Sequence, residues 1–372
     1  MHRTTFQKEK SQKQSIIQYL VKMKNKYFIL SSSCKVVKGY TRSVIVDYNR
    51  GDLIFISKEY ADLINNIDRK LLADVYAELE DKKTMIHFEE FLDFLLKTEI
   101  AFLADDVERF PKISERISDD YVLLQDVIIE LDENLFNEKY FQKLCEDLKE
   151  LRCKDFQFRL LSNFNVTFLN TVIKIINSTS IHYLEIHGTF NEQTNTKILH
   201  EFIENNAIVS KIFIYSSPSV SKYQTINDIE GFYPFNLGEI WFIDYAFDNG
   251  NCCGIINFEN LNFTSFHLHN KLKSQNGCLD KKITIDKYGN IKNCPSLKEQ
   301  YGNIKDTSIK EVLKNKEFTK YWNIHKDQIE TCKICEFRYN CTDCRAFIQN
   351  PSDIYSKPSK CSYNPITCEW ED

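Results

Sequence analysis

The sequence is poor in the residues that loosen or interrupt a chain. Its 372 residues include only 10 glycines and 7 prolines, so we expect no long flexible linkers and closely packed domains. It has no apolar run of about 20 residues, the length that a membrane-spanning helix needs. Residues 1–26 are too polar and lysine-rich for the apolar core of a secretory signal peptide. We therefore expect a cytoplasmic protein without a membrane partner.

The sequence also lacks an excess of positive charge. It contains 48 lysines and arginines against 53 aspartates and glutamates, which gives a net charge of −5. Nothing in this balance favours a nucleic-acid partner, because proteins that bind nucleic acids need basic residues to neutralise phosphates. A hydrophobic content of 42% and a charged content of 27% are typical of globular domains. The length suffices for two or three domains with substantial cores.

Familiar catalytic and nucleotide-binding motifs are missing as well. No glycine-rich loop follows an expected strand, so neither a dinucleotide-binding fingerprint nor a phosphate-binding loop can be recognised. Charged residues near expected strand ends, such as Glu130, Asp132 and Asp244, suit solvated loops or helix caps equally well. The sequence therefore assigns no catalytic residue.

Cysteine, by contrast, is concentrated near the end of the chain. Eight of the 13 cysteines fall within the final 95 residues, namely Cys278, Cys294, Cys332, Cys335, Cys341, Cys344, Cys361 and Cys368. Core cysteines do not cluster at such spacings, and disulfides are disfavoured in a reducing compartment. Because four thiolates complete one tetrahedral metal site or hold one iron–sulfur cluster, eight predict two sites. Spacing alone does not separate zinc from iron–sulfur.

Residues 27–110 combine short β-rich runs with amphipathic helices. Gly51 can supply the positive φ of a hairpin turn, Ser57 is a candidate N-cap for the first helix, and Thr84 for the third. The expected elements are strands 27–30, 43–48 and 53–56, helices starting near 58, 71 and 85, and a closing strand 101–104. This order resembles the winged-helix-like precursor-peptide recognition element of peptide-modifying enzymes, in which a leader peptide adds a strand to a sheet edge. A domain that only packs on the rest of the chain explains it equally well.

Residues 120–247 alternate strands with helices. The expected strands are 127–131, 156–160, 183–186, 211–215 and 240–243, with helices 139–151, 166–176 and 194–205 between them. This alternation predicts an α/β domain with a parallel sheet and right-handed crossovers. Five strands are too few for a closed eight-stranded barrel, so we expect an open sheet or a partial barrel. Cys145 and Cys153 are expected in its core.

The C-terminal cysteines occur in a recognisable context. The pattern comprises Gly289 and Cys294 with four residues between them, the pairs Cys332/Cys335 and Cys341/Cys344, and Cys361. It resembles the SPASM domain of peptide-modifying radical SAM enzymes. The stretches 335–347, 363–365 and 368–370 look closer to one subfamily, the SPASM-domain peptide maturase of grasp-with-spasm systems. Only two residues separate Cys341 from Cys344, where the broad SPASM pattern has three.

The resemblance implies a ligand set. Cys332, Cys335, Cys341 and Cys361 would hold one auxiliary [4Fe–4S] cluster, and Cys278, Cys294 and Cys344 three corners of a second. Cys368, Cys252 and Cys253 are candidates for the fourth ligand, and an open iron is equally allowed. His267 and His269 are weaker candidates, because their i, i+2 spacing indicates one face of a strand.

A radical SAM enzyme also needs a Cys-x3-Cys-x2-Cys loop after its first barrel strand, and this triplet occurs nowhere in the chain. The resemblance therefore implies a degenerate radical-SAM-like partial barrel that does not cleave S-adenosylmethionine. The expected domains are a polar segment 1–26, the peptide-recognition domain 27–110, the βα domain 120–270 and the SPASM domain 275–372.

Three functions remain open at this point. The first is an accessory maturase that binds a precursor peptide and acts with an ATP-grasp ligase partner. The second is a non-catalytic scaffold whose iron–sulfur clusters or zinc ions only stabilise the fold, as structural metals do in small modules. The third is an electron-transfer protein with two clusters.

Overall fold

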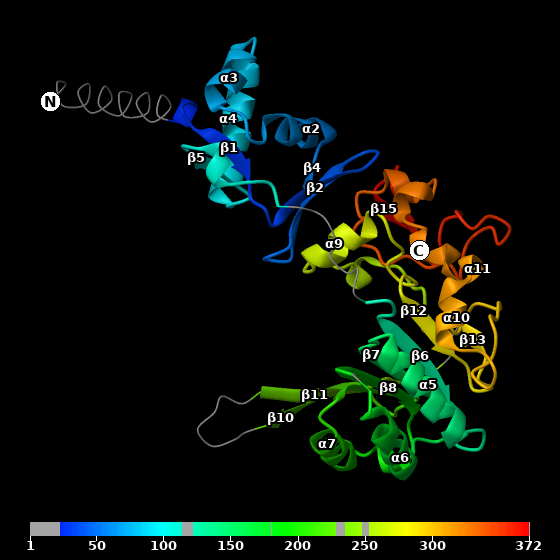
Figure 1. Cartoon of the computed structure of the whole chain (residues 1–372). Helices are drawn as coiled ribbons and strands as arrows, with labels where there is room; N and C mark the ends of the chain where they lie inside the picture. Colours follow the sequence, from blue (N-terminus) through cyan, green and yellow to red (C-terminus); the bar gives the residue numbers. More distant parts are fainter. Residues whose placement is uncertain (1–22, 114–121, 180, 228–234, 248–252, 372) are drawn as a thin grey trace.

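The computed structural model describes residues 23–113, 122–179, 181–227, 235–247 and 253–371. Most of the expected polar segment 1–26, and Cys252, lie outside these residues. Figure 1 shows an N-terminal α/β part, a large sheet with helices on it, and a C-terminal part with little regular structure lying between them. No helix among the described residues is both long and apolar enough to cross a membrane.

The N-terminal part contains two small sheets and three helices. A two-stranded antiparallel sheet joins the first strand to the last, and a three-stranded antiparallel sheet has the order β2-β3-β4. The elements are β1 (Tyr27–Leu30), β2 (Cys34–Lys38), β3 (Ser43–Asp47), β4 (Asp52–Ile56), α2 (Lys58–Ile67), α3 (Leu72–Ala77), α4 (Lys82–Lys97), β5 (Ala101–Ala104) and η1 (Val107–Arg109). The expected strands and helices are thus present, with β2 in addition.

Local sequence explains the turns and caps of this part. Gly51 adopts a φ of +72° in the turn between β3 and β4, as expected. Ser57 caps α2 by accepting a hydrogen bond from the backbone N–H of Tyr60. The expectation that Thr84 caps α4 was wrong. Asp81 is the N-cap and accepts from the backbone N–H groups of Lys83 and Thr84, since its carboxylate reaches the first turn from just outside the helix.

The large sheet has the order β10-β11-β9-β8-β7-β6-β12-β13. Its six inner strands are parallel, and β10 and β13 pair antiparallel at the two ends. The strands are β6 (Asp126–Leu131), β7 (Asp155–Leu160), β8 (Tyr183–Thr189), β9 (Val209–Tyr215), β10 (Ser221–Asn227), β11 (Phe235–Phe242), β12 (Lys282–Ile285) and β13 (Ile291–Lys292). The sheet is therefore an open, mostly parallel α/β sheet, wider than the five strands expected.

Helices cover one face of this sheet. They are α5 (Glu138–Glu150), α6 (Val166–Ile176) and α7 (Thr196–Asn205), with a 3-10 turn η2 (Glu192–Thr194) before α7. Their apolar sides and alternate residues of the strands form the largest core of the protein, which includes Phe156, Phe158 and Ile186. Cys145 and Cys153 are buried in this core, as expected. In each strand, the residues that alternate with these core residues point to the opposite face of the sheet.

The C-terminal part continues the sheet and then becomes irregular. Strand β12 pairs with β6, so the cysteine-rich region begins on the sheet itself. The remaining elements are η3 (Phe258–Asn260), α9 (Phe266–Leu272), α10 (Ile309–Lys314), α11 (Lys316–Thr319), η4 (Lys320–Asn323), η5 (Lys326–Gln328), η6 (Cys332–Ile334), β14 (Tyr363–Asn364) and β15 (Glu369–Trp370). His267 and His269 lie on the helix α9, so the expected strand was wrong. Ser265 caps this helix and starts the helical turn.

The β2–β3 hairpin packs on the C-terminal part. Backbone N–H of Tyr40 donates to the carbonyl of Ile334 at 2.8 Å, and Arg42 Nε donates to Glu336 Oε1 at 2.7 Å. Glu336 is fully buried, and it also accepts a hydrogen bond from the hydroxyl of Tyr363 at 2.5 Å. A shared apolar cluster, which includes Val44 of β3, reinforces these polar contacts. The N-terminal part therefore rests directly on the chain segment that carries Cys332 and Cys335.

Candidate metal centres

Thiols outside the C-terminal half are ordinary core groups. Cys34 lies in the N-terminal core, where burial and the charge of Asp47 raise the pKa of its thiol to about 11. Burial likewise raises the pKa of Cys145 to about 12. Cys153 donates a hydrogen bond to the carbonyl of Gln125 at 3.3 Å. Such protonated, buried thiols are poor metal ligands, because the thiolate is the form that binds metal.

Four thiols influence one another electrostatically around η6. Burial raises the pKa of Cys332 to about 11, and charge at Cys341 and Cys361 adds to the rise. Burial also raises the pKa of Cys335, with further contributions from Cys332 and Cys341. Backbone geometry supports a thiolate here, since the N–H of Phe337 donates to Cys335 Sγ at 3.4 Å. The structure thus brings into one neighbourhood the four residues that the resemblance assigns to the first cluster.

A second set of thiols lies beside the start of β12. Burial raises the pKa of Cys294 to about 12, and charge at Cys278 and Cys344 contributes. Burial and the charge of Cys278 also raise the pKa of Cys344. Cys278 and Cys294 also pack against one apolar cluster, and the charge of Cys278 acts on Cys344. Their grouping as ligands stays a prediction.

Among the candidates for a fourth ligand, Cys253 has the best position. It precedes Gly254, where a Cβ atom would come within 2.9 Å of Cys344 Sγ. Gly254 also has a φ of +78°, so this close approach needs glycine. Cys368 instead lies between β14 and β15, and its thiol donates to the carbonyl of Pro365 at 3.8 Å. Cys252 lies outside the described residues.

Chemically, the donor sets suit iron–sulfur clusters, which are held by cysteine thiolates. Within the described residues, however, no three histidine, cysteine, aspartate or glutamate side chains converge closely enough to hold a metal ion as they stand. His269 is not available as a ligand through Nδ1, because this atom forms a 2.6 Å hydrogen bond with the hydroxyl of Tyr48.

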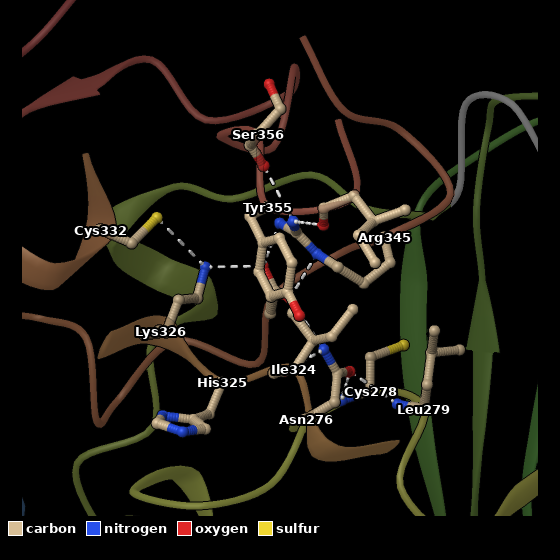
Figure 2. A network of polar contacts seen from close by, with 12 residues as sticks. Asn276, Cys278, Leu279, Ile324, His325, Lys326, Cys332, Arg345, Tyr355 and Ser356 are labelled. Carbon is tan, nitrogen blue, oxygen red and sulfur yellow. Dashed lines mark hydrogen bonds and ion pairs between the residues drawn. The ribbon is translucent and has the colours of Figure 1, made fainter. Parts of the chain in front are cut away.

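A buried charge network connects the two sets (Figure 2). Lys326 Nζ lies 2.9 Å from Asp343 Oδ1 and donates to Cys332 Sγ at 3.8 Å. Burial opposes the charge of this ammonium group, but Asp343 and the thiols of Cys341 and Cys332 raise its pKa well above the ordinary lysine value. Lys326 therefore supplies a fixed positive charge next to thiolates that would carry negative charge.

The same network extends through Asp343 and Asn276 to the backbone of Cys278. Asn276 Nδ2 donates to Asp343 Oδ2 at 2.8 Å, while its Oδ1 accepts from the backbone N–H of Cys278 at 3.0 Å. Arg345 forms a further ion pair with Asp343, and its Nη1 donates to the carbonyl of Ser356 at 2.8 Å. Asp343 has a φ of +72°, a conformation that aspartate tolerates better than most residues. One carboxylate thus orders the surroundings of both thiol sets.

Sequence reasoning missed a polar chain on the face of the sheet opposite the helices α5, α6 and α7. His187 bonds through Nε2 to Glu185 Oε1 at 2.6 Å and through Nδ1 to the hydroxyl of Tyr215 at 3.0 Å. Burial lowers the pKa of His187, although Glu185 opposes the shift. A carboxylate, an imidazole and a phenol in series can move a proton. The sequence feature that could have revealed this polar chain is the recurrence of polar residues at every second position of buried strands.

This polar chain approaches the second thiol set through Arg159. Its Nε donates to Gln157 Oε1 at 2.7 Å, and its Nη2 lies 3.7 Å from Cys253 Sγ. Gln157 in turn donates to Glu185 Oε1 at 2.6 Å. The polar face of the sheet is therefore connected by hydrogen bonds to the residue best placed as fourth ligand.

Comparison with known proteins bears on the second thiol set and η6. Residues 278–336 match the SPASM family, described as an iron-sulfur cluster-binding domain. The matched SPASM segment contains Cys278, Cys294, Cys332 and Cys335, and it supports iron–sulfur binding by this part of the chain. No curated protein matches the sequence.

One solved structure spans most of the chain length. It is the crystal structure of Streptococcus suis SuiB bound to S-adenosylmethionine, with 9% sequence identity, 86% of this chain and 96% of that chain covered, and a TM-score of 0.27. The two chains overlay only loosely.

Proposed function

We propose that this protein is an accessory maturase in the modification of a ribosomally made peptide. Residues 27–110 bind the precursor peptide, and the SPASM region carries two auxiliary [4Fe–4S] clusters. The subfamily is that of grasp-with-spasm systems, and the crosslinking partner is an ATP-grasp ligase. The βα domain is a degenerate radical-SAM-like partial barrel that does not cleave S-adenosylmethionine.

The match of residues 278–336 to an iron–sulfur cluster-binding domain carries the cofactor part of this proposal. Cys332, Cys335, Cys341 and Cys361 would hold the first cluster, and Cys278, Cys294, Cys344 and Cys253 the second. When bound, the clusters would supply one-electron chemistry or an iron site for a substrate atom. Lys326 and the Cys335–Phe337 contact would stabilise the negative charge of the thiolates.

The packing of the N-terminal part on the SPASM region supports the proposal that this protein binds a peptide. The three-stranded sheet contacts the chain on both sides of Cys335 through Tyr40 and Arg42. A peptide bound at an edge of this sheet would thus lie near the first thiol set. This arrangement would bring a captured substrate to the clusters without a large domain movement.

The decisive experiment is anaerobic purification of the full chain, with iron, sulfide and zinc measured per chain. We expect about eight irons and eight sulfides, the content of two [4Fe–4S] clusters. About four irons per chain would indicate a single cluster. Zinc without iron would overturn the cofactor assignment and favour a metal-stabilised scaffold.

Peptide capture is tested separately on the cluster-loaded full chain. Precursor peptides encoded next to the gene are labelled with a fluorophore and titrated by anisotropy. Saturable binding is expected for the peptide and not for a scrambled version of it. Equal binding of the two, or none, would contradict the recognition role.

A further inference from the structure

His187 is a protonatable group buried on the polar face of the large sheet. Its ring lies against the rings of Phe213 and Phe247, with centroids 4.8 and 5.6 Å away, and the residue is only 8% exposed. Two polar groups reach the imidazole, the carboxylate of Glu185 at 2.6 Å and the hydroxyl of Tyr215 at 3.0 Å. Burying three such groups costs more than burying apolar ones, which points to a use of the imidazole beyond packing.

The neighbours of His187 decide which ring nitrogen carries its proton. Burial works against the ionised form of Glu185, but hydrogen bonds from His187 and Gln157 keep the pKa of this carboxyl below its usual value. A carboxylate only accepts hydrogen bonds, so Nε2 of His187 donates and Nδ1 accepts from the hydroxyl of Tyr215. A second proton therefore enters at Nδ1, where the phenol can transfer it.

Arg159 connects the imidazole with the second thiol set. Its guanidinium group lies 3.7 Å from Cys253 Sγ, and Arg159 is the register partner of His187 on the neighbouring strand. The guanidinium group also lies 5.6 Å from the centroid of the Phe247 ring, which flanks the imidazole as well. Burial lowers the pKa of His187, Glu185 opposes this shift, and the charge of Arg159 adds to it. One buried cation thus acts on the imidazole and contacts a candidate ligand.

Negative charge added at the second thiol set would act on His187 through this arrangement. An electron held beside Cys253 would offset part of the positive field of Arg159, and a buried site screens such fields poorly. Because that field disfavours the imidazolium, weakening it increases the affinity of His187 for a proton. Linkage is reciprocal, so a proton on His187 favours the added electron by the same free energy.

The buried chain is within reach of solvent protons on two sides. A cavity of about 150 Å³ lies beside it and is lined in part by Gln157, Glu185 and Lys282. Its volume and its polar lining suit water molecules. On the other side, Tyr215 contacts the ring of Tyr245, which is 53% exposed. The imidazole can therefore exchange protons without unfolding of the sheet.

Other ionisable groups face the imidazole or its hydrogen-bonded partners. Besides Glu185, Arg159 and Tyr215, they are Glu130 on β6, Asp155 on β7 and Lys211 on β9. Between pH 5 and 8 the imidazole is the side chain whose ordinary pKa permits a change of charge. Burial and the charge of Asp126 raise the pKa of Asp155, which makes Asp155 the rival for the proton.

We propose that His187, held by Glu185 and Tyr215, couples the uptake of one proton to one-electron reduction at the second thiol set. A low-potential one-electron donor supplies the electron, which is held at that set. Solvent supplies the proton, which His187 takes up at Nδ1. One N–H bond forms, and the net charge of the site does not change. The inference rests on the proposed iron–sulfur cofactor and adds a proton-coupled electron transfer to the proposed function.

The test measures reduction potentials of the full chain after anaerobic cluster loading. EPR-monitored titrations with dithionite are run between pH 5.0 and 8.0. The signal of the second set is the one that Cys278→Ser alters or removes. From pH 5.0 to 8.0 we expect its reduction to become about tenfold less favourable, which is about 59 mV for one electron. The other signal should not depend on pH in this range.

Three variants locate the proton. His187→Gln keeps hydrogen-bonding groups but cannot titrate, so it should remove the pH dependence of the second signal. Glu185→Gln removes the charge that favours the imidazolium and should move the dependence to lower pH. His200→Gln is the matched control, because His200 lies on α7 and bonds to Thr225. If His187→Gln loses its iron, the shift in Glu185→Gln decides.

The outcomes separate the inference from the proposed function. A second signal whose potential does not change with pH overturns the inference and leaves both clusters in place. The same holds if the dependence persists in His187→Gln, a result that would place the proton on another group such as Asp155. An unchanged dependence in Glu185→Gln overturns the role of the hydrogen-bonded chain. If the loaded chain shows no second signal, the inference and the second cofactor site both fall.

Discussion

The ammonium group of Lys326 lies 2.9 Å from a carboxylate oxygen of Asp343, and both side chains are almost completely buried. Lys326 reaches the thiol of Cys332, while Asp343 precedes Cys344 and contacts Asn276 at the backbone of Cys278. The ion pair therefore joins the surroundings of the two thiol sets.

Removing the charge of Asp343 should damage both thiol sets. Asp343→Asn leaves the buried charges of Lys326 and Arg345 without their partner, which we expect to cost about 3–5 kcal/mol of unfolding free energy. Iron content should fall for both clusters. Anaerobic urea unfolding and iron analysis measure the effects, with Glu330→Gln, an exposed neighbour, as control. Loss of only one cluster would show that the network does not serve both sites.

The fourth ligand of the second site can be identified by single substitutions. Cys253→Ser should alter the EPR signal of one cluster on reduction and leave the other unchanged, because Cys253 adjoins the close contact between Gly254 and Cys344. Cys368→Ser is the matched control and should leave both signals intact. The reverse result would place Cys368 in the site and contradict our assignment.

The contact between Arg42 and Glu336 should hold the N-terminal part in place. Arg42→Met removes the guanidinium group, which lies over the ring of Phe55, and leaves the carboxylate of Glu336 buried without its cation. We expect a loss of about 1–3 kcal/mol in unfolding free energy and faster limited proteolysis of the N-terminal part. Lys333→Met, an exposed change nearby, should have neither effect. Unchanged proteolysis in Arg42→Met would mean that the apolar cluster alone fixes the N-terminal part.

His187 should make the protein less stable in acid. Burial lowers the pKa of this imidazole below its usual value of 6.5. Below pH 6.5 the unfolded chain therefore takes up a proton that the folded chain does not, so stability falls as the pH falls. His187→Gln should reduce the dependence of the urea midpoint on pH between 7.5 and 5.5. His182→Gln, at an exposed position, should leave the dependence as it is; an identical change in both variants would contradict a role for the buried imidazole.

The strands and helices that could be predicted from the sequence are those with a continuous apolar or amphipathic pattern. The strands around Val127, Phe156 and Leu184 are apolar and flanked by amphipathic helices, so their type and order could be inferred. Strand β2 was not predicted, because Lys35 and Lys38 flank its two valines and leave only a short apolar run. The strand also lies at the edge of its sheet. The helix α9 was taken for a strand, since the spacing of its two histidines fits either structure and its cap at Ser265 was not recognised.

The candidate sites were less predictable than the fold. Cysteine spacing and the family resemblance suggested which thiols group together, but spacing contains no information on the buried partners of those thiols. Lys326 and Asp343 are 17 positions apart and meet only through tertiary structure. Similarly, Glu185 and His187 are adjacent on one face of β8, yet the bond to Tyr215 depends on the neighbouring strand.

Strand β6 (Asp126–Leu131) is an inner strand only because β12 (Lys282–Ile285) pairs along one side of it. On the ribosome, that side stays open while roughly 150 further residues are made, which takes about 8–30 s at 5–20 residues per second. During this interval the growing chain presents an apolar, unpaired strand to other nascent chains. We therefore expect chaperone dependence and slower translation to influence the yield of this protein more strongly than its final stability does.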